Sequence, residues 1–226
     1  MSDSRSPTTG RRGFVGAVAS MGAGWALGAD ARAQQLLVTQ QSAGASDAWL
    51  DQLKGKHRQL FDVPEPEGGT ALRHLRNYLD AWHNAFGVGE KDVSVVVALY
   101  ARTTPLGLQD AMWEKYQLGA ALSITDPTTN APLVRNWFAH PKPGDPVADG
   151  EPGTSMETLQ QRGVLFALCN NALTRWAARL AKSGGGAPAD VHADLVAHAL
   201  PAVVIVPDVL VAMTKAHERG FAYVRS

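Results

Sequence analysis

Apolar and polar stretches alternate along the chain after residue 55, and the alternation predicts strands and helices in turn. Short apolar runs, several of them rich in β-branched residues, predict strands at 56–63, 93–99, 164–168, 202–206 and 221–225. Apolar positions spaced three and four residues apart predict helices at 47–53, 70–86, 106–122, 155–162, 171–182, 188–199 and 207–219. This alternation is typical of an α/β fold with a mostly parallel, doubly wound sheet of about five strands.

Local signals set the ends of several helices. Ser155 is a candidate N-cap, and the glycines of 183–186 stop the helix that begins near Asn171. Pro207 is expected in the first turn of the last helix, where its missing N–H costs nothing.

The segment 125–153 breaks the pattern, because six prolines and three glycines interrupt it. A connection of this length without periodicity is usually functional or mobile. We therefore treat it as a proline-rich insertion, with Trp137 and Phe138 as candidate partner contacts.

The first 33 residues resemble a twin-arginine signal peptide. Arg11 and Arg12 precede Phe14, a weakly apolar run extends to residue 27, and Ala31 and Ala33 give the small-x-small pattern read by signal peptidase. The run is too short to span a bilayer, so no stable membrane span is expected. The leader predicts export to the periplasm through the twin-arginine translocase and cleavage by signal peptidase, with 34–55 as a flexible lead-in and short helix.

Charge and cysteine content narrow the function further. Without the leader, 17 basic and 19 acidic residues remain, a net charge of −2, which is not typical of a nucleic-acid-binding protein. Cys169 is the only cysteine, so no internal disulfide can hold the fold.

The segment 163–175, Gly-Val-Leu-Phe-Ala-Leu-Cys-Asn-Asn-Ala-Leu-Thr-Arg, resembles the strand-cysteine-helix segment of DsrE/TusD-like sulfur-relay proteins. The segments 202–206 and 219–223 agree with that family, and the resemblance extends over about 56–225 with 125–153 as an insertion. It implies a three-layer α/β/α sandwich, a homo-oligomer, and persulfide transfer with Cys169 as the catalytic residue.

The carboxyl ends of the predicted strands meet at one edge of the sheet, where open α/β sheets bind ligands. Cys169 lies there at a helix N-terminus, which stabilises a thiolate, although free cysteines are also among the most buried residues. The candidate binding residues at this edge are Tyr100, Arg102, Thr103, Thr104, Asn170, Asn171, Asp208 and Asp62. Arg102 and the two threonines offer a charge and hydroxyls to an anion, whereas helix capping is the simpler role for the asparagines.

No metal ligand pattern is present. His192 and His198 are six residues apart, His74 stands alone on its helix, and only folding of the insertion would bring His57 and His140 together. No serine-hydrolase elbow, phosphate-binding glycine loop or dinucleotide fingerprint occurs either.

Two functions are therefore expected for this periplasmic chain. One is sulfur handling as a persulfide on Cys169, as a sulfur carrier or sulfurtransferase. The other is non-catalytic binding of a ligand or cofactor, of unknown identity, in the sheet-edge crevice beneath the proline-rich loop.

Overall fold

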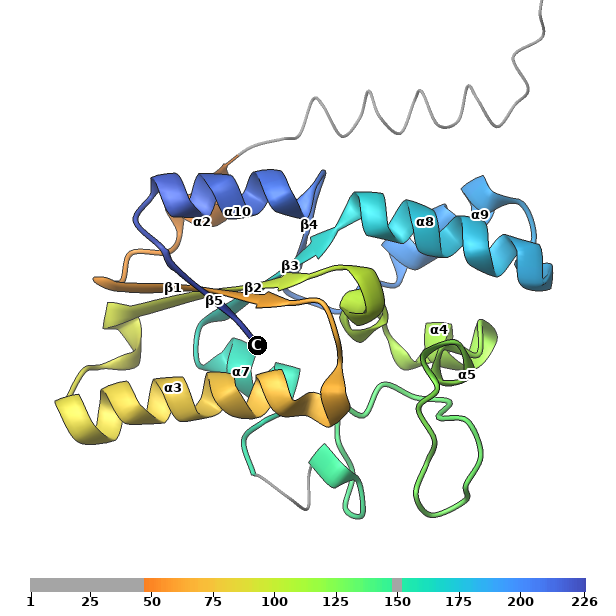
Figure 1. Cartoon of the computed structure of the whole chain (residues 1–226), viewed down its shortest axis with the longest axis horizontal. Helices are drawn as coiled ribbons and strands as arrows, with labels where there is room; N and C mark the ends of the chain where they lie inside the picture. The colour runs from red at the N-terminus through yellow and green to blue at the C-terminus, as the bar shows by residue number, and fades with distance from the viewer. Residues whose placement is uncertain (1–46, 148–151) are drawn as a thin grey trace, which may run out of the picture.

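Five parallel strands form one sheet in the order β4-β3-β2-β1-β5 (Figure 1). This computed structural model describes residues 47–147 and 152–226; the predicted leader and residues 34–46 lie outside the described residues. The strands are β1 (His57–Val63), β2 (Val93–Leu99), β3 (Val164–Cys169), β4 (Val203–Val206) and β5 (Ala222–Arg225). The predicted fold class and the positions of all five strands are confirmed.

Helices cover both faces of the sheet and complete a three-layer sandwich (Figure 1). One face carries α3 (Thr70–Phe86), α4 (Asp110–Lys115), α5 (Leu118–Leu122) and α7 (Met156–Gln161). The other carries α2 (Ala48–Asp51) and α10 (Val209–Glu218), while α8 (Asn170–Leu180) and α9 (Pro188–Ala197) extend beyond the carboxyl end of β3. The connections include three short 3-10 helices, η1 (Glu67–Gly69), η2 (Glu90–Asp92) and η3 (Ala101–Gly107), and a π turn, η4 (Ala181–Gly185).

The central strands divide their side chains between two apolar cores. Every residue of β2 and β3 is buried, as expected for strands covered on both faces. Val97 and Phe166 belong to the core beneath α3, whereas Ala98 and Ala167 belong to the core beneath α10, because successive side chains point to opposite faces. We call these the α3-side core and the α10-side core.

The prediction of one continuous helix at 106–122 is wrong: tertiary contacts break it, and only the short helices α4 and α5 form within this range. The 3-10 helix η3 ends at Gly107, and Leu108 adopts an extended conformation in an antiparallel bridge with Ala199. A second break follows at Gln117, whose φ of 49° is left-handed and separates α4 from α5. Gly119 then packs so closely on the Leu133 backbone that any side chain would overlap it.

The last long helix also starts later than predicted. Pro207 precedes the helix, and the carboxylate of Asp208 accepts the backbone N–H groups of Leu210 at 2.7 Å and Val211 at 3.4 Å. Asp208 is therefore the N-cap, a role for which aspartate is among the best residues.

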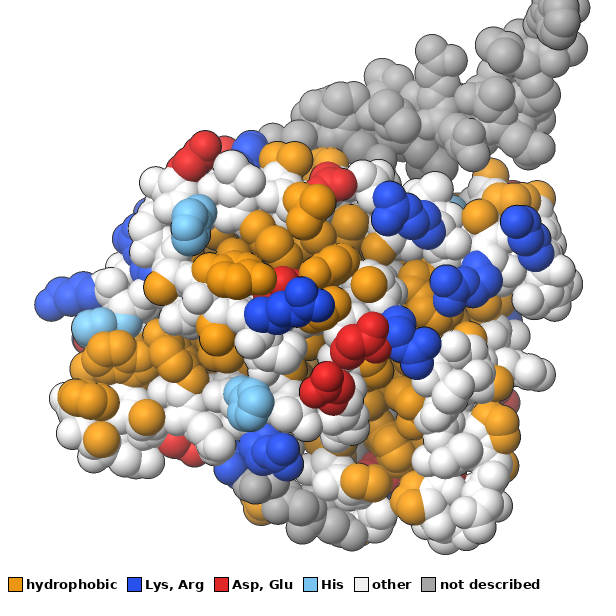
Figure 2. Space-filling model, viewed as in Figure 1, with side chains coloured by type: hydrophobic (Ala, Val, Ile, Leu, Met, Phe, Trp, Pro, Cys, Tyr) orange, Lys and Arg blue, Asp and Glu red, His pale blue; other side chains and the backbone are white. Residues whose placement is uncertain are grey.

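On the face shown in Figure 2, apolar side chains remain visible between this helix and the sheet.

The described part of the proline-rich segment is a structural element of the α3-side core. Trp137 is 5% exposed and Phe138 is fully buried, so the prediction that these two residues contact a partner is wrong. Asn136 anchors the segment: its Nδ2 donates to the carbonyl oxygens of Leu106 at 2.7 Å and Leu108 at 2.8 Å. The described part of this loop packs into that core and does not form a lid over the α10 side of the carboxyl edge.

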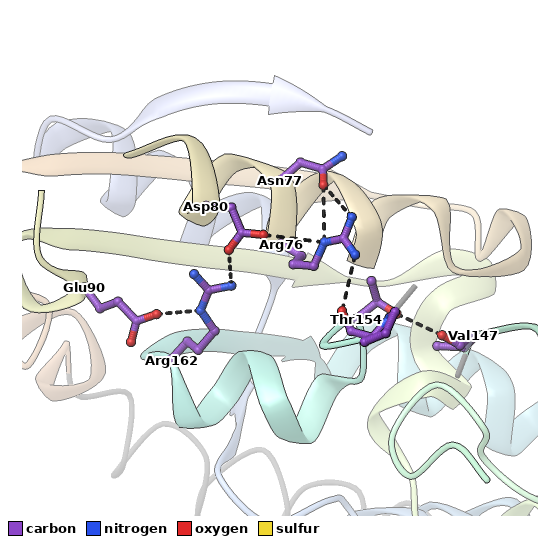
Figure 3. Close-up of polar contacts among 8 residues, drawn as sticks. Arg76, Asn77, Asp80, Glu90, Val147, Thr154 and Arg162 are labelled. Carbon is purple, nitrogen blue, oxygen red and sulfur yellow. Dashed lines mark hydrogen bonds and ion pairs between the residues drawn. The ribbon is translucent and has the colours of Figure 1, made fainter. Parts of the chain in front are cut away.

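A polar network ties α3 to the residues around α7 (Figure 3). The guanidinium of Arg162 contacts Asp80 at 2.8 Å and Glu90 at 2.5 Å. Asp80 also lies 3.7 Å from Arg76, which donates to the Pro152 carbonyl at 3.3 Å. These contacts hold the chain that leads into β3 against α3.

We expect Asn136→Ala to lower the free energy of unfolding by about 2–3 kcal/mol, because it leaves two buried carbonyl groups without their donor. Urea denaturation measures the change. Thr128→Ala, at an exposed position of the same segment, is the control and should stay within about 0.5 kcal/mol of wild type. Equal stabilities for the two variants would contradict the anchoring role of Asn136.

Candidate functional site

Parallel register brings Cys169 into a row of side chains at the carboxyl edge of the sheet. Cys169 pairs with Val206 of β4, and Leu168 pairs with Leu99, so Tyr100 follows at the level of Cys169 on the other side. All three side chains contact the α10-side core. Cys169 is 4% exposed and stands at the N-cap position of α8, so the sulfur is enclosed among apolar groups at a helix N-terminus.

A groove of about 200 Å³ lies next to this row, between α2 and α10. Its apolar lining comes from Trp49, Val206, Pro207, Val211 and Ala212, and its polar lining from Asp47, Asp208 and Lys215. Val206 and Ala212 line the groove and also belong to the α10-side core that contains Cys169, so the groove adjoins the core in which the sulfur is buried. We call these two residues the groove floor. The groove therefore occupies the sheet-edge position at which the sequence predicts a binding crevice.

Two ion pairs join the α2 segment to α10, and one of them, Lys215 with Asp47, lines the groove. Lys215 contacts Asp47 at 2.5 Å, and Arg219 pairs with Asp51. Beneath them, Leu50 is 2% exposed in the α10-side core. The α2 segment is fixed in place by both charge and apolar contact.

The asparagines after Cys169 are engaged with the protein itself. Asn170 is buried, and its Oδ1 lies 2.9 Å from Nε2 of His192 in α9. Burial lowers the pKa of His192, which favours the neutral ring. Asn171 is exposed and donates from Nδ2 to Asp208 at 2.7 Å, which links the first turns of α8 and α10 at the rim of the groove.

Tyr100 belongs to a second polar group at the same edge. Asp62 is 5% exposed; its Oδ2 accepts the hydroxyl of Tyr223 at 2.6 Å, and its Oδ1 has no hydrogen-bond partner among the described residues. Burial, followed by the neighbouring Asp62 carboxylate, raises the pKa of Tyr100 to about 12. The hydrogen bond to Asp62 is the main cause that raises the pKa of Tyr223.

Arg102, Thr103 and Thr104 have structural roles in η3 and do not line the groove. The Thr103 hydroxyl donates to the Val63 carbonyl at 2.5 Å, and the Thr104 hydroxyl donates to the Ala101 carbonyl at 3.1 Å. Arg102 donates to the Leu122 carbonyl at 2.7 Å and pairs with Glu65 at 2.8 Å. The expectation that these side chains serve a bound anion is corrected, because the backbone and Glu65 already occupy them.

The histidines that the sequence leaves as possible metal ligands, His57 and His140, do not lie together. His57 stacks on Trp82 with 3.8 Å between ring centroids, and His140 faces Glu157 at 3.0 Å, so the insertion does not bring them together. Within residues 47–147 and 152–226, no three histidine, cysteine or carboxylate side chains form a group that could hold a metal ion.

The sequence predicts Asp208 at this edge of the sheet but not the apolar lining of the groove. A signal was present in α10: Val209, Ala212 and Ala216 fill its buried face, which leaves Leu210 and Val211 exposed at 62% and 54%. Two apolar residues beyond the buried stripe of a helix indicate a surface with a further role.

We expect Asp62→Asn to lower the pKa of Tyr223 and, to a smaller extent, that of Tyr100, because a negative charge beside each phenol disappears. Absorbance at the phenolate band, followed from pH 9 to 13, measures both. The raised pKa of Tyr100 stabilises the fold below its unfolded pKa of about 10 and stops doing so as pH rises through about 12. Tyr78 and Tyr116 are internal controls, since burial raises the pKa of Tyr78, and burial followed by Asp194 raises that of Tyr116. An unchanged titration curve in Asp62→Asn would contradict this assignment.

No described helix is both long and apolar enough to cross a membrane. No protein-family model matches the chain, and no curated protein matches it. Among solved structures, the chain is similar to a protein of unknown function, MTH1491 from Methanobacterium thermoautotrophicum. The TM-score is 0.41 and the identity 16%, and the match covers 75% of this chain and 99% of that one.

Proposed function

We propose that this chain binds a small ligand, without catalysis, in the groove between α2 and α10. The observation that carries the proposal is a hollow of about 200 Å³ with mostly apolar walls at the carboxyl end of β4. Ligand sites in proteins combine apolar walls with a few polar groups, and in α/β folds they form at this edge of the sheet. The proposal keeps the sheet-edge crevice expected from the sequence and drops the proline-rich loop as its cover.

The groove can be tested by filling it. We expect Val211→Trp to abolish ligand binding, because an indole placed at a lining position occupies the hollow. The measurement is native mass spectrometry of the mature chain purified from the cells that produce it. Wild type should carry a bound small molecule that Val211→Trp lacks.

Leu210→Trp is the matched control, since Leu210 precedes Val211 on α10, is similarly exposed and does not line the groove. It should retain the ligand. A wild-type protein without any bound molecule, or equal occupancy in both tryptophan variants, would remove the proposal.

Sulfur handling on Cys169 is the second candidate function, favoured by the position of Cys169 at the N-terminus of α8. The backbone N–H groups and dipole of a helix N-terminus favour a thiolate. In the proposed step, the Cys169 thiolate attacks the outer sulfur of a donor persulfide. A new sulfur–sulfur bond forms on Cys169, the donor's sulfur–sulfur bond breaks, and the donor leaves as a thiolate. The enclosure of Cys169 means that the groove floor must open first.

We expect a persulfide donor to add about 32 Da, one sulfur atom, to wild type slowly and to Val206→Ala about ten-fold faster. The smaller side chain thins the floor over Cys169, and a ten-fold ratio corresponds to about 1.4 kcal/mol in the free energy of local opening. Intact-mass analysis against time measures the rates. Val204→Ala, on the same strand and in the same core but outside the groove, is the control.

Cys169→Ser should gain no mass under these conditions. An equal gain in Cys169→Ser, or no gain in wild type, would remove the sulfur function. Both candidate functions are proposed for the periplasm, because of the predicted twin-arginine leader, and for a homo-oligomer, because of the resemblance in 163–175.

A further inference from the structure

The geometry points to a small hydrophobic amine as the class of ligand for the groove, with its ammonium group at Asp208 and its apolar part against Trp49. The inference rests on the proposed ligand-binding function and adds the chemistry of the ligand to it. It follows from the charges that line the groove, from the acceptor sites that Asp208 leaves open, and from the aromatic wall.

The polar lining of the groove has an excess of negative charge. It contains two carboxylates, Asp47 and Asp208, and one amine, Lys215. Lys215 lies 2.5 Å from Asp47, so these two charges neutralise each other. No lysine or arginine among the described residues forms an ion pair with Asp208, and the nearby charge of Arg175 acts from outside the lining. A ligand that neutralises the groove therefore carries a positive charge.

Asp208 is ionised and has room for another donor. Burial raises its pKa, but donors from Asn171, Leu210 and Val211 outweigh that effect and lower it overall. Those three N–H groups are the neutral donors to its two oxygens, and one of the contacts is long, at 3.4 Å. A carboxylate offers about four acceptor positions, so an ammonium N–H can add without displacing a protein donor.

The apolar lining of the groove suits the rest of such a molecule. Trp49 is half-buried, and its indole lines the groove together with Val206, Val211 and Ala212. Tryptophan attracts cations to its face more strongly than the other aromatic residues, and it also provides apolar contact for a hydrocarbon group. An anion placed at the same end of the groove would be repelled by the charge of Asp208.

Three isosteric probes separate these contributions: benzylamine, benzyl alcohol and benzoate. We expect benzylamine to bind the mature wild-type chain about five- to ten-fold more tightly than benzyl alcohol at neutral pH, and benzoate to bind most weakly. Chemical-shift titration of the methyl groups of Val206 and Val211 measures the three affinities. Raising the salt concentration should reduce the advantage of benzylamine and leave benzyl alcohol unchanged.

Asp208→Asn is the decisive variant, because asparagine keeps the N-cap while the charge is lost. It should bring the affinity of benzylamine down to that of benzyl alcohol. Asp190→Asn, at an exposed position in the first turn of α9, is the control and should leave all three affinities unchanged.

The outcomes distinguish this inference from the function on which it rests. If benzyl alcohol binds as tightly as benzylamine, or if Asp208→Asn changes nothing, the amine selectivity is wrong while the groove still binds a ligand. If benzoate binds most tightly, the sign of the charge is wrong. If no probe shifts the methyl signals and the purified chain carries no ligand, ligand binding itself is wrong and the inference is overturned with it.

Discussion

The register of the parallel sheet determines which side chains lie next to one another at its carboxyl edge. Once Phe166 lies opposite Val97 and Val203, the positions at which β2, β3 and β4 end are fixed relative to one another. A shift of one residue would turn every side chain of a strand to the opposite core. Because both faces are covered, the apolar side chains on each face forbid such a shift. The row formed by Val206, Cys169 and Tyr100 is thus a consequence of core packing.

The same constraint explains why a hollow forms beside that row. Cys169 and Val206 present their side chains to the α10 side, and α10 covers them with small residues, Ala212 and Ala216. A helix with alanine on its buried face can lie close to the sheet, and its exposed Val211 then forms a wall. The second wall needs α2, which is held by buried Leu50 and by the ion pairs of Lys215 and Arg219 with Asp47 and Asp51. The groove therefore depends on apolar packing on one side and on apolar packing together with ion pairs on the other.

Much of the fold can be predicted from the sequence, because most of its elements are specified by local patterns. The helix at 70–86 has a continuous apolar stripe, and the structure reproduces its bounds. The helix at 106–122 could not be predicted correctly, because the bridge to distant Ala199 holds Leu108 extended. The position of the candidate groove was predictable too, since the topology places crevices at the carboxyl edge of such a sheet. The residues that line the groove could not be predicted, because hydrogen bonds within the protein decide which polar side chains can reach a ligand. The Thr103 hydroxyl, for example, was expected to face a ligand, but it donates to the Val63 carbonyl.

The two candidate functions share one structural element and therefore oppose each other. Val206 and Ala212 line the groove and also belong to the core in which Cys169 is buried. A ligand that fills the groove adds a further layer over the sulfur and stabilises the closed floor by mass action. Sulfur transfer requires that floor to open, so an occupied groove slows it. If the chain works in the periplasm, as proposed, the closed state protects Cys169 from oxidation, because a buried thiol is oxidised slowly. The packing of α10 over Cys169 thus favours a closed form in which the thiol is covered, and a ligand bound in the groove as proposed would add to that preference.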